Sequence, residues 1–246
     1  MRNHVKLWMS ERAALLCCLA SSFSFACVDL GQGRIDVPVS VAGVAVDSVT
    51  ARDGWEVQLQ RAELAFGPLY LCPGELAGDL CETARAEWLH SVVVDALDPD
   101  AKGAGALIGS EGSTGSMMFD LGSYWPLVTS RPTLTAAGRS LGAGVVLEGQ
   151  AQRGERQLSF VARLEINASE AGRSVGSVQI ERRTLMARDG SLLLRIDPTP
   201  WVEDMDFSAL DSEGEVVMID LESQAGRAVR NGLLNRWSPE FVWNAD

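Results

Sequence analysis

Histidine and lysine are scarce in this chain of 246 residues. There are two histidines, His4 and His90, and two lysines, Lys6 and Lys102. Ser-His-Asp and Cys-His catalytic arrangements need a histidine, and zinc sites draw heavily on histidine and cysteine. We therefore expect a structural or surface role for His90. The shortage of lysine also leaves little scope for Schiff-base chemistry.

Long apolar runs and an excess of positive charge are missing as well. No apolar run reaches the roughly 18 residues that a membrane-spanning helix requires. The 33 acidic residues outnumber the 21 basic ones and give a formal net charge of −12. This argues against a nucleic-acid partner, because neutralising phosphates needs a basic face. Hydrophobic residues still make up 46% of the chain, so we expect a sizeable core.

The N-terminus has the pattern of an export signal. Residues 1–12 carry three basic side chains, and residues 13–26 form an apolar stretch of the length of a signal-peptide core. Ser24 and Ala26 satisfy the small-x-small rule for cleavage. The sequence therefore predicts that residues 1–26 are a signal peptide, cut before Cys27.

Cys27 directly after Ala26 resembles the lipobox of bacterial cell-envelope lipoproteins, a resemblance limited to residues 1 to about 30. It implies that Cys27 is acylated and anchors the protein to a membrane. Val28 follows the cysteine in place of the aspartate of the inner-membrane retention signal. The resemblance thus implies an outer-membrane lipoprotein facing the periplasm or the cell surface. Ser24 stands where the family prefers leucine, which leaves open a soluble secreted protein or a cytoplasmic protein with a buried N-terminal helix.

The remaining cysteines fit an exported protein. Cys17 and Cys18 would leave with the signal peptide, and Cys72 and Cys81 would remain as a pair nine positions apart. In an oxidising compartment such a pair predicts one disulfide that closes a short loop and stabilises the fold by about 2–3 kcal/mol. Two buried free thiols are the alternative.

Two-residue alternation predicts an all-β fold, an antiparallel β-sandwich of immunoglobulin-like or transthyretin-like type with one or two short helices. Residues 55–66 alternate with one phase slip, which predicts a β-bulge near Gln60 and Arg61. The predicted organisation is a signal peptide over residues 1–26, a lipid anchor and tether over 27–38, and a sandwich domain over 39–246.

Turn signals predict how some of the strands connect. Residues 145–151 and 158–166 form a predicted hairpin, and residues 175–187 and 191–197 form a second one around an Asp-Gly pair. Proline and glycine predict a long surface loop over residues 126–144. A helix is predicted over residues 223–234, with Ser223 as its N-cap.

Two acidic clusters are candidates for calcium. Asp95, Asp98 and Asp100 lie on a turn and offer the oxygen ligands that calcium prefers, although the EF-hand spacing is absent. A solvated turn is the plainer interpretation. The same two interpretations apply to a second acidic patch made of Glu203, Asp204, Asp206, Asp211, Glu213 and Glu215.

Six tryptophans follow the predicted cleavage site, and most large aromatic side chains in a sandwich belong to its core. Tyr124 and Trp125 open the predicted long loop, so they are the candidates for stacking on a ligand. Met117 and Met118 carry thioethers, which copper(I) accepts as ligands. Neighbouring side chains on a strand point to opposite faces and do not easily share one ion, so both are expected to pack in the core.

These features lead to a non-enzymatic binding or structural role in the cell envelope, with a membrane as one partner. Two alternatives stay open: a carboxylate-dependent hydrolase of envelope polymers, which needs a suitable pair of acids, and a calcium- or carbohydrate-binding adhesion module. No cofactor is expected other than calcium in the last case. Whether a protein or a glycan is the partner stays open.

Overall fold

The computed structural model describes residues 33–74, 83–121, 134–165, 174–185, 190–210 and 216–244. Residues 174–183 are described by their backbone alone. Gly33–Asp246 forms one compact unit. None of the helices in the described ranges has both the length and the apolar character that a membrane-spanning helix needs.

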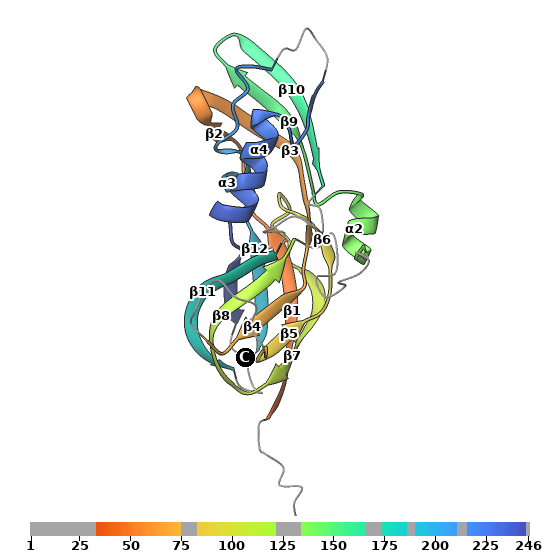
Figure 1. Ribbon diagram of the computed structural model, residues 1–246, viewed down its shortest axis with the longest axis vertical. Coiled ribbons are helices and arrows are strands. Elements are labelled where there is room, and N and C mark those ends of the chain that lie inside the picture. The colour runs from red at the N-terminus through yellow and green to blue at the C-terminus, as the bar shows by residue number, and fades with distance from the viewer. Residues whose placement is uncertain are drawn as a thin grey trace, which may run out of the picture. The chain divides into compact units, whose positions relative to one another are not determined.

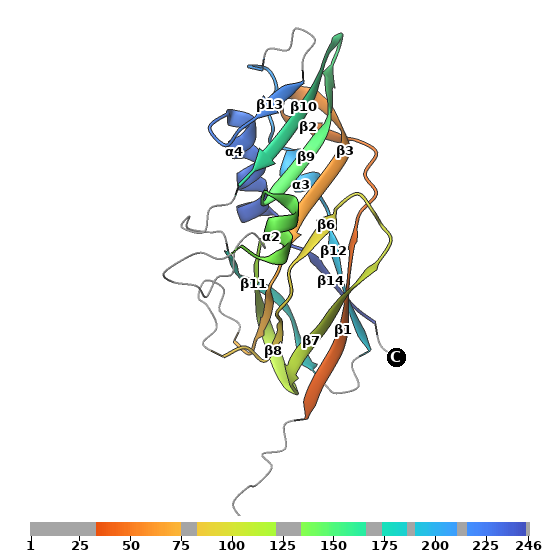
Figure 2. The same cartoon turned by 90° about the vertical axis from the view of Figure 1, so that its right-hand side faces the viewer.

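Two β-sheets make up this unit (Figures 1 and 2). The larger sheet has eight strands in the order β11-β8-β4-β5-β7-β1-β12-β14. Its strands are β1 (Arg34–Gly43), β4 (Leu69–Cys72), β5 (Ala86–Trp88), β7 (Lys102–Ser110), β8 (Gly112–Asp120), β11 (Ser174–Leu185), β12 (Ser191–Ile196) and β14 (Glu240–Asn244).

The smaller sheet has six strands, with the order β13-β10-β9-β3-β2 and with β6 paired to β3. In both views β6 lies where the two sheets meet (Figures 1 and 2). The strands are β2 (Val49–Ala51), β3 (Trp55–Phe66), β6 (Val92–Asp95), β9 (Val145–Arg153), β10 (Arg156–Leu164) and β13 (Val217–Ile219). The helical segments are η1 (Arg52–Gly54), α2 (Ala136–Leu141), α3 (Thr199–Val202), α4 (Gln224–Asn231) and η2 (Gly232–Arg236).

Both sheets and the helices α3 and α4 bury their apolar side chains in one shared core. At its centre, the ring of Phe66 lies 6.0 Å from that of Trp88, 5.4 Å from that of Phe119 and 6.2 Å from that of Trp237. Trp201 packs edge-on against Trp237 at 5.6 Å. We call these five residues the aromatic cluster. The prediction of an all-β sandwich with few, short helices is confirmed. Two strand pairs, β1–β12 and β10–β13, are parallel and not antiparallel.

Three local predictions are confirmed. The register between β3 and β9 shifts between Leu59 and Arg61, where the phase slip predicted a bulge. Strands β9 and β10 form the first predicted hairpin, and Gly154 in its turn takes the left-handed conformation with φ +61°. Ser223 caps α4, because its Oγ accepts a hydrogen bond of 3.0 Å from the backbone N–H of Gly226.

The second predicted hairpin is wrong. Strand β11 lies at one edge of the eight-stranded sheet, whereas β12 is its seventh strand and pairs with β1 and β14. The five residues between the two strands span at most about 20 Å, yet six strand spacings in a flat sheet would measure about 29 Å. The sheet must therefore curl, which brings the end of β11 towards the start of β12 without pairing them.

Two boundaries also differ from the prediction. Strand β1 begins at Arg34, so residues 34–38 belong to the sheet and not to a tether. There, Ile35 and Val37 are buried, while their neighbours face solvent. Within the predicted loop of residues 126–144, α2 forms because Thr135 caps its N-terminus and Gly142 ends it in the left-handed conformation.

Candidate functional site

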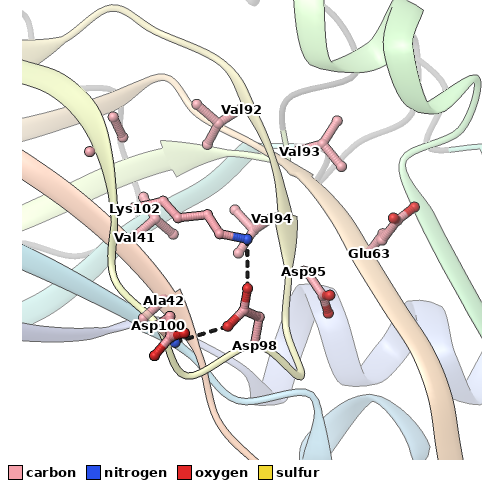
Figure 3. A pocket seen from close by; sticks show the side chains of 12 residues that line it. Val41, Ala42, Glu63, Val92, Val93, Val94, Asp95, Asp98, Asp100 and Lys102 are labelled. Atoms are coloured by element: carbon pink, nitrogen blue, oxygen red, sulfur yellow. Dashed lines mark hydrogen bonds and ion pairs between the residues drawn. The ribbon is translucent and has the colours of Figure 1, made fainter.

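A pocket of about 420 Å³ opens where β6 of the smaller sheet separates from β7 and β1 of the larger one. Figure 3 shows Lys102 and Asp98 beside Val94, whereas Asp95 and Glu63 lie further to the right. The lining residues are Val41, Ala42, Glu63, Val92, Val93, Val94, Asp95, Asp98, Asp100, Lys102, Gly103 and Ala104.

The turn between β6 and β7 is fixed to both sheets, which sets the position of the pocket. The N–H of Ala96 donates to the carbonyl of Ala62 in β3 at 2.7 Å. On the other side, the N–H groups of Gly43 and Val44, at the end of β1, donate to the carbonyls of Asp98 and Ala96 at 2.7 and 2.9 Å. These bonds tie the turn to β3 and to the end of β1, so they fix the place where β6 and β7 begin to separate.

Gly43 makes this close approach sterically feasible. A Cβ atom at this position would lie 2.4 Å from the backbone carbonyl of Ala96. No larger residue fits there unless the turn moves away from β1.

The carboxylates of Asp95 and Asp98 stabilise the turn by accepting hydrogen bonds from its backbone. Asp95 accepts a hydrogen bond of 3.0 Å from the N–H of Leu97, and Asp98 accepts one of the same length from the N–H of Asp100. The second carboxylate oxygen of Asp98 accepts a hydrogen bond from Lys102 Nζ at 2.6 Å (Figure 3). Hydrogen bonding to Lys102 lowers the pKa of Asp98, and the same contact raises the pKa of Lys102.

The lining carries four carboxylates and one ammonium group. Asp95 faces Glu63 directly across the pairing of β6 with β3, and like charges in this arrangement repel each other. Glu63 is partly neutralised, because Arg61 binds it at 2.7 Å and also binds Glu148 at 2.7 Å. The pocket therefore keeps an excess of negative charge.

The structure brings Asp95, Asp98 and Asp100 to one pocket, but it does not arrange them as a calcium cage. Over the described ranges, no three His, Cys, Asp or Glu side chains are close enough together to hold a metal ion. Both oxygens of Asp98 are engaged, one with Lys102 and the other with the N–H of Asp100. The geometry does not support the calcium prediction at this turn.

Three acidic side chains of the second patch bind other groups of the same chain. Arg236 binds Glu203 at 2.7 Å and forms an ion pair with Asp204. Asp206 accepts a hydrogen bond of 2.8 Å from the N–H of Ser208, and this bond lowers its pKa. Residues 211–215 lie outside the described part of the chain.

Several predicted site residues cannot be placed. Cys27, Cys81, Tyr124 and Trp125 lie outside the described residues, so the acylation, the disulfide and the stacking site stay predictions. Cys72 is buried in the last position of β4, opposite Ser116 of β8.

Four tryptophans and the adjacent methionine pair are core residues. Trp55, Trp88, Trp201 and Trp237 are all buried, and so are Met117 and Met118. The sequence reasoning did not identify Glu63 or the valines of β6 as part of a site. Their only sequence signal is strand alternation, which does not reveal that β3, β6 and β7 meet.

Comparisons with known proteins add little. No family model matches the chain, and no curated protein matches it. Among solved structures, the chain is similar to MbnP from Methylosinus trichosporium, with 12% sequence identity and a TM-score of 0.41. The match covers 81% of this chain and 88% of that one. A similarity of this size supports no conclusion about the function of this chain.

Proposed function

We propose that this chain is a non-enzymatic binding protein of the cell envelope, and that its ligand is a small organic cation held in the pocket between β6 and β7. The observation that carries the proposal is the lining of this pocket, which combines four carboxylates and one ammonium group with four valines. Its volume of about 420 Å³ lies within the range of small-molecule sites.

Two of the carboxylates are available to a ligand. In the described part of the chain, Asp95 and Asp100 have no ion-pair partner, whereas Asp98 is bound to Lys102. Val41 and Val94 are largely buried and offer an apolar surface beside these acids. A ligand with an amine at one end and methylene groups behind it would satisfy both features.

Binding fits this pocket better than hydrolysis does. A carboxylate-dependent hydrolase needs one acid whose pKa is raised so that it can donate a proton near neutral pH. Here Lys102 lowers the pKa of Asp98, which favours the charged form. A carboxylate held in its charged form does not serve as that acid.

Titration calorimetry with spermidine tests the proposal. We expect spermidine to bind the full-length chain, and succinate, a dianion, to give no heat. Replacing both Asp95 and Asp100 by asparagine should weaken spermidine binding about tenfold, since two exposed charge contacts are lost.

Glu240→Gln is the matched control, because Glu240 is an exposed carboxylate on β14 that pairs with Arg195 away from the pocket lining. Its affinity for spermidine should equal that of the unaltered chain. The absence of binding, or equal losses in the control and the double variant, would overturn the proposal.

The proposal includes export, cleavage before Cys27 and acylation of that cysteine in the outer membrane. The basic start, the apolar stretch of residues 13–26 and the small residues before Cys27 support it. Mass spectrometry of the N-terminal peptide should find a lipid on Cys27, and globomycin should block its maturation. An unmodified peptide that begins at Cys27 would contradict the anchor but not export.

A disulfide between Cys72 and Cys81 belongs to the same proposal, because an oxidising compartment favours it. Peptide mapping without reductant should recover the two cysteines in one linked species. Labelling of both as free thiols in the denatured, unreduced protein would contradict this pairing.

A further inference from the structure

The pocket runs along the edge of a strand and not across its face. Four consecutive residues of β6, Val92 to Asp95, line it, and so do Lys102, Gly103 and Ala104 of β7. Successive side chains of a strand point to opposite faces. A cavity that touches every residue in turn must therefore lie against the backbone itself.

No strand in the described part of the chain pairs with the edge of β6 that borders the pocket, although the end of β1 lies nearby. Among the described residues, β6 pairs with β3 alone, from Phe66 opposite Val92 to Glu63 opposite Asp95. A strand edge without a neighbour presents N–H and C=O groups that can pair with another chain.

The opposite wall is open at Gly103 and occupied beside Ala104. Strand β7 pairs with β1 along one edge, and among the described residues the backbone of β5 pairs with Gly109 and Ile108 on the other. The indole N–H of Trp88, at the end of β5, also donates to the carbonyl of Ala104 at 2.7 Å. Apart from Gly103 and its two chain neighbours, no heavy atom of the described residues lies within 4 Å of the position that a Cβ of Gly103 would occupy. The wall therefore recedes beside Gly103.

We propose that the ligand is an extended peptide segment with basic side chains, and that about four of its residues add as a strand to the free edge of β6. The inference rests on the proposed function and names its ligand class. Backbone hydrogen bonds to β6 would give the affinity. The excess of carboxylates, with Asp95 at the end of the edge, would select lysine or arginine in the segment.

The test uses the acetylated, amidated peptide Val-Lys-Val-Lys-Val and the full-length chain, with binding followed by calorimetry. We expect this peptide to bind, and the version with glutamate in place of both lysines not to bind. Raising the ionic strength should weaken binding, because the charges at the mouth of the pocket are exposed.

Two backbone-methylated versions of the peptide give the decisive comparison. In a strand, alternate N–H groups point to opposite edges, so only one set can pair with β6. One version is methylated at the backbone amides of the two lysines, and the other at those of alternate valines. The version that loses the hydrogen bonds to β6 should bind at least about fivefold more weakly than the parent peptide. Methylation of the other set should leave binding unchanged.

The outcomes separate this inference from the proposed function. If both methylated peptides bind as well as the parent, or if spermidine binds and the peptide does not, strand addition is wrong and the cation site stands. If neither peptide nor spermidine binds, both proposals are wrong. A third outcome is that one methylated peptide binds more weakly than the other, while the parent peptide binds the double variant of Asp95 and Asp100 as tightly as it binds the unaltered chain. In that case strand addition stands, but the basic character proposed for the segment is wrong.

Discussion

The aromatic cluster and the acidic rim of the pocket, which comprises Glu63, Asp95, Asp98, Asp100 and Lys102, are built from opposite kinds of interaction. Phe66 and Trp201 have no exposed surface. The side chain of Lys102, by contrast, is 69% exposed, although it forms the shortest contact of the rim. Buried rings stabilise a fold strongly, whereas exposed ion pairs contribute little. The rim charges can therefore serve a ligand without being needed for folding.

The largest effect is expected in the aromatic cluster. Phe66→Ala removes a ring that contacts Trp88, Phe119 and Trp237, so it should lower the free energy of unfolding by about 3–5 kcal/mol. Urea denaturation followed by tryptophan fluorescence measures this loss. Leu89→Ala, at an exposed position, is the control and should change stability by less than about 0.5 kcal/mol.

The same variant also tests whether the two regions are separable. At low temperature, where Phe66→Ala is still folded, its affinity for spermidine should equal that of the unaltered chain. A large loss of affinity in a folded variant would show that the rim depends on the cluster, contrary to our account.

An intermediate effect is expected at Gly43, where the turn meets β1. Gly43→Ala places a methyl group against the backbone of Ala96, so we expect a loss of about 1–3 kcal/mol together with weaker spermidine binding. Thermal denaturation and calorimetry measure the two effects. Gly74→Ala meets no atom of another described residue within 4 Å and should change neither. If Gly43→Ala binds spermidine as tightly as the unaltered chain, the position of the turn does not determine the ligand site.

The smallest effect on stability is expected at Lys102. Lys102→Gln removes the ammonium group that competes for Asp98, so spermidine should bind about two- to fivefold more tightly, while the melting temperature changes little. Weaker binding in this variant would mean that Lys102 contacts the ligand, which would favour an anionic group in it.

The same variant should also change the pKa of Asp98. Lys102 holds the pKa of Asp98 below its usual range, so the stabilisation by this pair is present near neutral pH and is lost as the pH falls through that lowered pKa. In Lys102→Gln, an NMR titration should find the pKa of Asp98 higher than in the unaltered chain. An unchanged pKa would contradict the hydrogen bond.

Features that depend on neighbours in the sequence could be predicted. The bulge at Arg61, the hairpin of β9 and β10 and the cap at Ser223 each follow from a short stretch of residues. The acidic turn was found for the same reason, because Asp95, Asp98 and Asp100 are close in the sequence.

Features that depend on distant pairing could not be predicted. An Asp-Gly pair is a favoured hairpin turn, but here the strand order of the eight-stranded sheet places five other strands between β11 and β12. Glu63 joins Asp95 only because β3 pairs with β6, across 31 residues of chain that alternation alone does not align. The pocket and the position of Glu63 in it therefore depend on the topology, whereas the cluster of Asp95, Asp98 and Asp100 depends on the local sequence.

The most direct test of the binding site is to map where spermidine acts, by NMR on the isotopically labelled full-length chain. We predict that the backbone amide signals of residues 92–95 and 102–104 shift in a saturable way, while those of the aromatic cluster stay fixed. Shifts confined to the acidic residues 203–206, or no saturable shifts at residues 92–95, would contradict the assignment of this pocket as the ligand site.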